Sequence, residues 1–393
     1  FWLKAAPGAI SAADAPTPYL HKLVMPLLGR WALPLQCLLG AGAAEVALPA
    51  EEDPANRWEM TKSPAYAVQE MWIKLMQVHT MRDLDIMNFT EPGMCFPPPM
   101  RSVVKEHWEE IEGNVERGRK LAADTKVIFA GLLRDESSAV IPTYAALMMI
   151  ARHFKDYHFF LLENDSEDAT AHWLRVVSKK DPKFEHKSER LMLGNERSTE
   201  RARFKRMADL RNRLRDWIES FVRQNAGWDL IVMLDIDIFK AGPFAVSTHS
   251  FFSALGRPET YANQWDMLCS NGIHSLKTGH DHFSMHDCFA FRTEGSDWWN
   301  AENCSSDKEV GLKLWLGYDL VPVHSCFGGM AFYKPDALFR CRYDPAVFDC
   351  EHVTLHQCMR EHGSENRMFM DQLLTVNYDA FVHQSCLPSR GDL

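Results

Sequence analysis

Short apolar runs alternate with helical patterns over the middle of the chain. Val127–Leu133, Tyr157–Leu162 and Asp229–Leu234 have the length of strands, and a shorter run lies at Leu191–Leu193. Their residues do not alternate between apolar and polar, which is typical of strands buried on both faces. Because strands that alternate with helices form βαβ units, the pattern predicts an α/β fold with a mainly parallel sheet. The segments with helical spacing between the runs are Ile141–Phe154, Ala169–Ser178 and Thr199–Gln224.

The first sixty residues lack this regularity. Residues 1–60 are rich in Ala and Pro, which predicts a leader or linker. Their most apolar part, Leu23–Leu48, contains prolines and charges, whereas a membrane-spanning helix needs about 20 nearly uninterrupted apolar residues. A leader is therefore expected. The alternative is the remnant of an N-terminal signal-anchor, with the anchor lost or outside the chain.

The rest of the chain divides into a helical extension and a main domain. Residues 61–122 predict helices, including a charged amphipathic one at Val103–Lys120. The main domain is expected over 123–385. Its first half, 123–240, carries the βαβ pattern, and its second half, 241–385, is less regular and richer in Trp, His, Cys and Gly. The simplest interpretation is a nucleotide-binding half followed by a half that shapes a second site.

Composition and charge narrow the classes of function. Hydrophobic residues make up 46% of the 393 residues, which excludes a disordered chain. The formal net charge is −10 and no long basic block occurs, so a nucleic-acid partner is not expected.

The cysteines gather in the second half of the chain. Of ten cysteines, eight lie from Cys269 to Cys386, and none forms a C-x-x-C pair. Disulfides in an oxidising, secretory compartment are therefore predicted in preference to a zinc ribbon. Buried free thiols in a cytosolic protein are the alternative.

Two carboxylates close the last apolar run of the first half. Asp235 and Asp237 follow Leu230–Leu234, and side chains at i and i+2 of an extended strand point the same way. Ligands of open parallel sheets bind at the carboxyl ends of the strands. Paired carboxylates there suit Mn²⁺ or Mg²⁺, which can neutralise a diphosphate as it leaves a sugar carbon. A solvated strand end is the alternative.

Polar residues follow the other runs as well. Glu163, Asn164 and Asp165 close the second run and can hydrogen-bond the base or ribose of a nucleotide, or cap the next helix. Arg134, just past the first run, is a candidate for the base or the diphosphate.

The long basic helix supplies further candidates. Arg211 and its neighbour Asn212 lie within it, and an arginine there can hold a phosphate through two hydrogen bonds. A solvated basic face is the alternative.

Two motifs of the second half are candidates for binding the acceptor. His286 and Asp287 precede an apolar run. His286 is a candidate for acceptor binding, and Asp287 is a candidate catalytic residue that can orient a sugar hydroxyl, or it simply belongs to a turn. Gly328 and Gly329 also precede an apolar run, and paired glycines allow the backbone to approach a ligand closely, or mark a bulge.

A later motif combines an acid with imidazoles. Glu351 stands beside His352 and near His356. Either histidine can complete a metal shell, and Glu351 can contact the acceptor or act in acid–base catalysis. Packed core histidines are the alternative.

These motifs, in this order, resemble those of the fungal capsule-associated α-1,3-mannosyltransferases of glycosyltransferase family 69. The resemblance covers about residues 125–380 and is carried by the blocks around Arg134, Glu163, Arg211, Asp235 and Glu351. It implies a GT-A type fold, a nucleotide-sugar donor, a glycan or glycoconjugate acceptor and a divalent cation. It also implies a type II membrane setting in the Golgi or ER lumen, and a front-face retaining mechanism.

The match is incomplete at the carboxylate pair. Members of that family tend to carry Asn-Asp-Val where this chain has Asp235-Ile236-Asp237. Mannose is therefore an analogy, and the linkage stays open.

Two other functions compete with glycosyl transfer. Phosphatases and phosphotransferases of the haloacid-dehalogenase type also place Asp-x-Asp after an apolar strand, and Asp235 would then be the nucleophile. Phe239 stands where that class usually has Thr or Val, which argues against it. The third candidate is a non-catalytic carbohydrate-binding relative.

Overall fold

The computed structural model describes residues 100–192, 200–241, 245–275, 283–285, 289–294 and 317–378. All of them belong to the second of the two units into which the chain separates, Met60–Leu393. The predicted leader, most of the helical extension and the His286-Asp287 pair lie outside the described residues. No helix among the described segments combines the length and the apolar character that crossing a bilayer requires.

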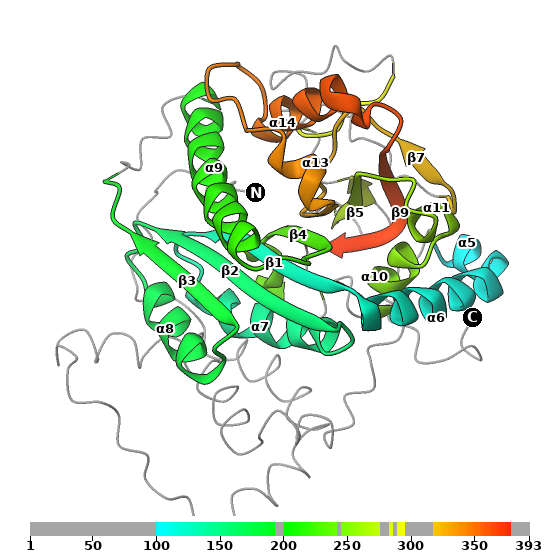
Figure 1. The fold of residues 1–393 in the computed structure, drawn as a ribbon, viewed down its shortest axis with the longest axis horizontal. Helices are drawn as coiled ribbons and strands as arrows, with labels where there is room; N and C mark the ends of the chain where they lie inside the picture. The colour runs from blue at the N-terminus through cyan, green and yellow to red at the C-terminus, as the bar shows by residue number, and fades with distance from the viewer. Residues whose placement is uncertain are drawn as a thin grey trace, which may run out of the picture. The chain divides into compact units, whose positions relative to one another are not determined.

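One mixed sheet organises the described residues. Nine strands form it there, in the order β3-β2-β1-β4-β8-β5-β9-β7, and β6 pairs with β5 (Figure 1). The strands are β1 (Lys126–Leu133), β2 (Asp156–Asn164), β3 (Phe184–Glu189), β4 (Leu230–Asp235), β5 (Met267–Ser275), β6 (Phe283–Met285), β7 (Leu320–Pro322), β8 (Met330–Tyr333) and β9 (Met368–Asn377).

Helices cover both faces of this sheet. In Figure 1, α7 and α8 lie on one face of the first four strands and α9 lies on the other. The α-helices are α5 (Arg101–Glu106), α6 (Trp108–Asp124), α7 (Ser137–Ala151), α8 (Thr170–Lys180), α9 (Glu200–Gln224), α10 (Thr248–Leu255), α11 (Pro258–Tyr261), α13 (Pro335–Phe339) and α14 (Glu351–Met359). Two shorter helical segments are η2 (Ile236–Ala241) and η3 (Arg360–Ser364).

The first four strands confirm the predicted fold class. β3, β2, β1 and β4 pair in parallel throughout, as βαβ units require. This is the Rossmann-type half of a GT-A-like α/β fold. β8 then joins β4 in the antiparallel sense.

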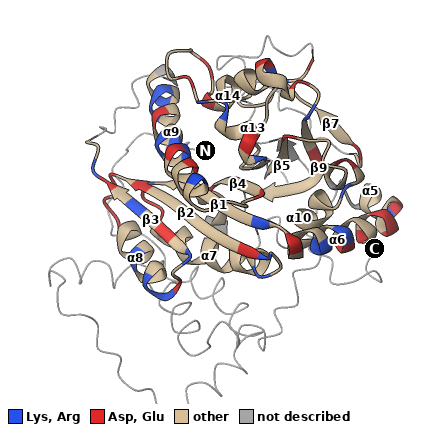
Figure 2. Cartoon of the chain, viewed as in Figure 1, with Lys and Arg blue, Asp and Glu red and all other residues tan. Residues whose placement is uncertain are grey.

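Both faces of β1, β2 and β4 are mostly buried, as their unbroken apolar runs indicate. On β1, Val127 and Phe129 pack into the core that contains α7, whereas Ile128 and Ala130 pack into the core that contains Leu214 of α9. Fully burying a large aliphatic or aromatic side chain contributes about 1.5–3 kcal/mol. These three strands are therefore held from both sides. In Figure 2, charged residues lie mainly on the helices, at strand ends and along the edge strand β3.

Three sequence predictions are wrong in detail. The third strand is Phe184–Glu189 and not Leu191–Leu193; it lies at the edge of the sheet and is mostly polar, so it leaves no apolar run. The helix expected from Ile141 begins at Ser137, which places Pro142 inside it. The helix expected at Val103–Lys120 is two helices, α5 and α6, separated at His107.

The second half is more regular than its sequence indicates. It contributes β5 to β9 to the same sheet, but three of these strands are only three or four residues long, too short to give a periodic signal. Disulfides Cys269–Cys326 and Cys341–Cys358 join its segments, which confirms the prediction of disulfides. Cys350 is buried and belongs to neither disulfide.

Candidate functional site

The parallel register brings the predicted strand-end residues to one edge of the sheet. Leu132 pairs with Asp235 on one side of β1, and Leu133 pairs with Glu163 on the other. Since neighbouring strands lie about 4.8 Å apart, the two acids are separated by roughly 10 Å along this edge. Arg134, the residue after β1, lies between them and is partly exposed, with its Nε 3.7 Å from a carboxylate oxygen of Asp135.

Asp235 and Asp237 do not share one extended strand. β4 ends at Asp235 and the chain turns into the 3₁₀ helix η2, which contains Asp237. The prediction that both side chains point the same way from one extended strand is therefore wrong. The two charges still interact. Burial raises the pKa of Asp235 to about 6, the Arg211 guanidinium opposes this shift, and the Asp237 carboxylate adds to it.

Arg211 joins the end of β4 to α14. Its Nη2 donates to Oδ1 of Asp235 at 3.0 Å and its Nε donates to Oε1 of Glu351 at 3.0 Å, while its side chain is 3% exposed. Burial lowers the pKa of Arg211, but the two carboxylates outweigh burial and raise it above its ordinary value. Residues predicted separately on a helix, a strand and a late motif therefore meet in one ion-pair network.

Several buried polar atoms around Arg211 have no hydrogen-bond partner within the described residues. These are Nη1 of Arg211, both ring nitrogens of His352 and the hydroxyl of Tyr343. The three residues as a whole are only 1–2% exposed. An unsatisfied buried polar group costs about 1–3 kcal/mol, and native structures keep few of them without a reason. We call Arg211, Asp235, Tyr343, Glu351 and His352 the arginine cluster.

Aromatic rings hold the arginine cluster in place. The His352 ring stacks on Phe327 with centroids 3.9 Å apart, and the Arg211 guanidinium lies 4.9 Å from the centre of the same ring. Tyr343 meets His352 edge-on at 5.8 Å. Burial lowers the pKa of His352 well below its usual value, so this histidine is neutral. The orientation of the unpartnered atoms is therefore fixed by packing.

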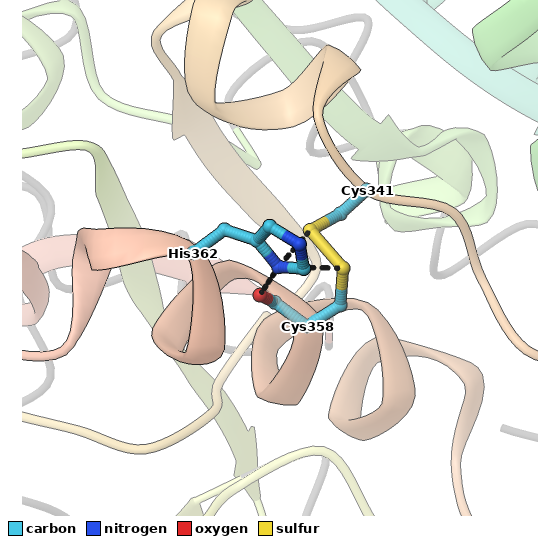
Figure 3. Close-up of side chains that lie close together, drawn as sticks. All are labelled: Cys341, Cys358 and His362. Carbon is cyan, nitrogen blue, oxygen red and sulfur yellow. Dashed lines mark hydrogen bonds between the residues drawn. A yellow bond between two sulfur atoms is a disulfide. The ribbon is translucent and has the colours of Figure 1, made fainter.

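His352 is not brought together with the two aspartates as a preformed set of three ligands. Among the described residues, one group has three metal-ligand atoms within 4.8 Å of one another, and it is Cys341, Cys358 and His362 (Figure 3). The two sulfurs of that group are joined in a disulfide, so they are not available to an ion.

Even without His352, Asp235 and Asp237 offer the carboxylate oxygens that a hard divalent cation prefers as ligands. Asp235 is 19% exposed and Asp237 is half-buried, so their oxygens are accessible. A cation between them would also relieve the repulsion that contributes to the raised pKa of Asp235. Mg²⁺ is commonly held by one or two carboxylates, with phosphate and water completing its shell. The two aspartates therefore fit such an ion without His352.

Glu163 and its neighbours are largely engaged in local structure. Oε1 of Glu163 accepts the backbone N–H of Ser166 at 2.7 Å, and Asn164 donates to Asp165 at 3.3 Å. Oδ1 of Asp165 accepts the backbone N–H groups of Leu191 and Met192 at 2.8 and 3.1 Å. These bonds support the structural alternative for the motif.

Side chains that follow β1 and β2 tie the two loops to each other. Asp135 accepts the N–H of Glu167, and Ser166 accepts the N–H of Asp135. Asp168 accepts the N–H of Ser137 at 3.0 Å and that of Thr170 at 2.9 Å, at the starts of α7 and α8. We call the connected residues the loop network: Asp135, Glu163, Asp165, Ser166 and Asp168.

Asn212 and the paired glycines position the arginine cluster. Asn212 exchanges two hydrogen bonds with the backbone of Tyr343, at 2.8 and 3.0 Å. The carbonyl of Gly329 accepts the N–H of Asp235 at 2.9 Å. Gly328 has φ +62°, and a Cβ there would lie 2.1 Å from the carbonyl oxygen of Ser270 on β5. The close approach that the glycines permit is thus to a neighbouring strand.

Tyr343 and Phe327 are members of the site that sequence reasoning missed. Tyr343 lies in an irregular stretch between α13 and α14, and Phe327 precedes the glycines. Neither carries a motif or a periodic signal. The sequence signal that lies nearest to them is Asn212, which was a candidate in its own right and which donates to the backbone carbonyl of Tyr343.

Comparison with known proteins gives remote structural likenesses only. No family model and no curated protein matches the sequence. The fold is similar to the mannosyltransferase PcManGT from Pyrobaculum calidifontis, solved in complex with GDP-Man and Mn²⁺, with TM-score 0.34 and 9% identity over 71% of this chain and 67% of that one. It is also similar to TarS residues 1–349 from S. aureus, with TM-score 0.35 and 13% identity over 63% of this chain and 58% of that one. Functional conclusions therefore depend on the chain's own residues.

Proposed function

We propose that this protein is a metal-dependent glycosyltransferase that moves a hexose from a nucleotide-diphosphate sugar to a hydroxyl of a glycan or glycoconjugate. The observation that carries the proposal is the arginine cluster at the carboxyl end of β4. Its buried polar atoms that have no hydrogen-bond partner among the described residues lie beside the carboxylate pair at the end of that strand. The order of motifs that resembles glycosyltransferase family 69 supports it, and makes mannose the first donor sugar to test.

Asp235 and Asp237 are the residues proposed to hold Mn²⁺ or Mg²⁺. A cation bound there supplies positive charge for the oxygens of the departing diphosphate. Arg211 sits next to them and keeps Asp235 oriented through its 3.0 Å hydrogen bond. Its Nη1, which has no hydrogen-bond partner in the described segments, is a donor for a phosphate oxygen, and arginine forms such charge-assisted bonds well.

Glu351 is proposed to position the arginine, and through it the diphosphate. Its Oε1 holds Nε of Arg211, and its Oε2 lies 3.6 Å from the Cys350 thiol. His352 and the Tyr343 hydroxyl are donors or acceptors for the transferred sugar or its phosphate. Arg134, Glu163, Asn164 and Asp165 are proposed to border the nucleoside at the neighbouring strand ends.

The transfer itself exchanges one carbon–oxygen bond for another. The oxygen of the acceptor hydroxyl bonds to the anomeric carbon while the bond from that carbon to the diphosphate oxygen breaks. The diphosphate leaves with the electron pair, and the hydroxyl proton passes to its oxygen. This is the front-face retaining course that the family resemblance implies.

The proposed setting is the lumen of the Golgi or ER, with a type II membrane anchor. The two disulfides support it, because disulfides persist in oxidising compartments.

Calorimetry with nucleoside diphosphates tests the proposal directly. GDP and UDP are titrated into the full chain with and without Mn²⁺, and tight binding is expected only with the metal. A screen of nucleotide sugars, with transfer followed by mass spectrometry, then identifies the donor. Metal-indifferent binding contradicts the proposal. Release of phosphate from a simple phosphomonoester through a covalent Asp235 intermediate would favour the haloacid-dehalogenase alternative.

A further inference from the structure

A cavity of about 620 Å³ lies beside α14, apart from the residues of the arginine cluster. Its volume is in the range of ligand-binding sites, and equals roughly twenty water molecules, enough for one or two hexose rings. Its walls come from α14, η3 and the segments around Arg292 and Ser325. The charged and amide side chains in its lining are Arg292, Asp349, Gln357, Arg360, Glu361 and Glu365.

The lining balances donors with acceptors. Asp349 is already paired with Arg292 at 2.9 Å, and Glu361 accepts from the amide of Gln357 at 3.1 Å. Three carboxylates disfavour an anionic ligand, and two guanidinium groups disfavour a cation. A neutral molecule rich in hydroxyl groups fits such a surface, since every hydroxyl both donates and accepts.

Arg360 provides evidence that the cavity takes a ligand. Its Nε is buried and has no hydrogen-bond partner in the described part of the chain. Glu361 and Glu365, the carboxylates that follow Arg360 along the chain, line the same cavity. A buried N–H of this kind is satisfied by a ligand acceptor or by water.

The cavity and the arginine cluster share a helix. Glu351 and His352 begin α14, whereas Gln357, six residues after Glu351 and so about 9 Å further along the axis, lines the cavity. Ser325 in the cavity wall bonds to Nδ1 of His356 at 2.9 Å, and the ring of His356 lies 5.9 Å from that of His352. A molecule in the cavity is therefore held close to the proposed site of transfer.

We infer that this cavity is a binding site for a neutral sugar unit of the acceptor glycan. The identification of that sugar as part of the acceptor rests on the proposed function. Gln357 and Arg360 contact the sugar hydroxyls. Val353, one turn before Gln357 on α14, also lines the cavity and offers apolar surface to the carbon–hydrogen face of a sugar ring.

Binding of a panel of neutral disaccharides, namely mannobiose, maltose and lactose, tests the inference. It is measured by saturation-transfer NMR and calorimetry on the full chain without nucleotide. At least one disaccharide is expected to bind, and Gln357→Ala and Arg360→Ala are expected to weaken it about tenfold, the loss of one good hydrogen bond. Arg223→Ala and Gln224→Ala, at the far end of α9, serve as matched controls and leave binding unchanged. Thermal unfolding verifies that all four variants fold.

The outcomes separate the cavity from the proposed function. Absence of disaccharide binding, equal binding by all variants, or displacement of the sugar by inorganic phosphate or by Mn²⁺ alone overturns the inference. If Mn²⁺-dependent nucleotide binding persists in that case, the proposed function stands. Disaccharide binding at Gln357 and Arg360 without any nucleotide binding would instead support the cavity as a sugar site and contradict the transferase.

Discussion

The loop network and the arginine cluster both lie at the carboxyl ends of the parallel strands, and they use polar residues in opposite ways. In the loop network, side chains such as Asp168 and Glu163 accept backbone N–H groups of the neighbouring loops. In the arginine cluster, Nη1 of Arg211, both ring nitrogens of His352 and the Tyr343 hydroxyl are buried and have no hydrogen-bond partner in the part of the chain that the structure describes. Polar groups that are hydrogen-bonded within the loops stabilise those loops. Polar groups that have no hydrogen-bond partner within the protein are available to bind a ligand. The number of buried polar atoms without a hydrogen-bond partner therefore distinguishes these two groups of residues, which look equally functional in the sequence.

Removing Arg211 is expected to have the largest effect. Arg211→Met leaves the carboxylates of Asp235 and Glu351 buried without their cation, which is expected to cost about 3–5 kcal/mol of unfolding free energy. Arg213→Met, two residues along the same helix, breaks an exposed pair with Glu189 and is expected to cost less than about 1 kcal/mol. Denaturation by guanidinium chloride measures both. Equal losses would remove the distinction between a buried network and a surface pair.

Asp237→Asn is expected to act on activity instead of stability. No hydrogen bond to the Asp237 side chain is found within the described residues, so the fold should lose little. Sugar transfer, however, is expected to fall about 100-fold, in line with the loss of one electrostatic stabiliser of a developing charge. Asp229→Asn is the control at the opposite end of β4, where the carboxylate accepts the N–H of Lys126. Mn²⁺-dependent nucleotide binding that survives in Asp237→Asn would exclude the aspartate from the metal site.

Asp168→Ala probes the loop network. The substitution removes the acceptor for the N–H groups of Ser137 and Thr170, and is expected to cost about 1–2 kcal/mol, as loss of a helix cap does. Nucleotide affinity, followed by calorimetry, is expected to stay within twofold of that of the unchanged chain, about 0.4 kcal/mol. A larger loss of affinity would assign the network a role in binding as well as in folding.

Removing the hydroxyl of either of two tyrosines is expected to give the smallest changes in unfolding free energy. Tyr144 donates to Asp181 at 3.0 Å in the core, so Tyr144→Phe is expected to cost about 1 kcal/mol. The Tyr343 hydroxyl has no partner among the described residues, so Tyr343→Phe is expected to change stability by less than about 0.5 kcal/mol, or to raise it. Chemical denaturation gives both values. A loss at Tyr343 as large as that at Tyr144 would show that its hydroxyl is satisfied in the free protein.

The sequence located most of the arginine cluster but not its arrangement. Arg211, Asp235, Glu351 and His352 each stood out locally, on a basic helix, at a strand end or beside another ionisable group. That Arg211 lies between two acids 24 and 140 residues away is a tertiary fact. Burial of Tyr343 and stacking of His352 on Phe327 left no periodic trace, because Tyr343 and Phe327 lie in irregular segments that pack against α14.

By itself, the sequence determined three of the four parallel strands, β1, β2 and β4, and the edge at which their polar residues gather. Apolar runs of strand length between helical patterns have few other ways to bury both faces, and parallel pairing then fixes which ends meet. Only the tertiary structure decided which polar residues have hydrogen-bond partners within the protein and which have none among the described residues. Hydrogen-bond satisfaction depends on the positions of individual atoms from distant segments, whereas the hydrophobic pattern depends only on neighbours along the chain.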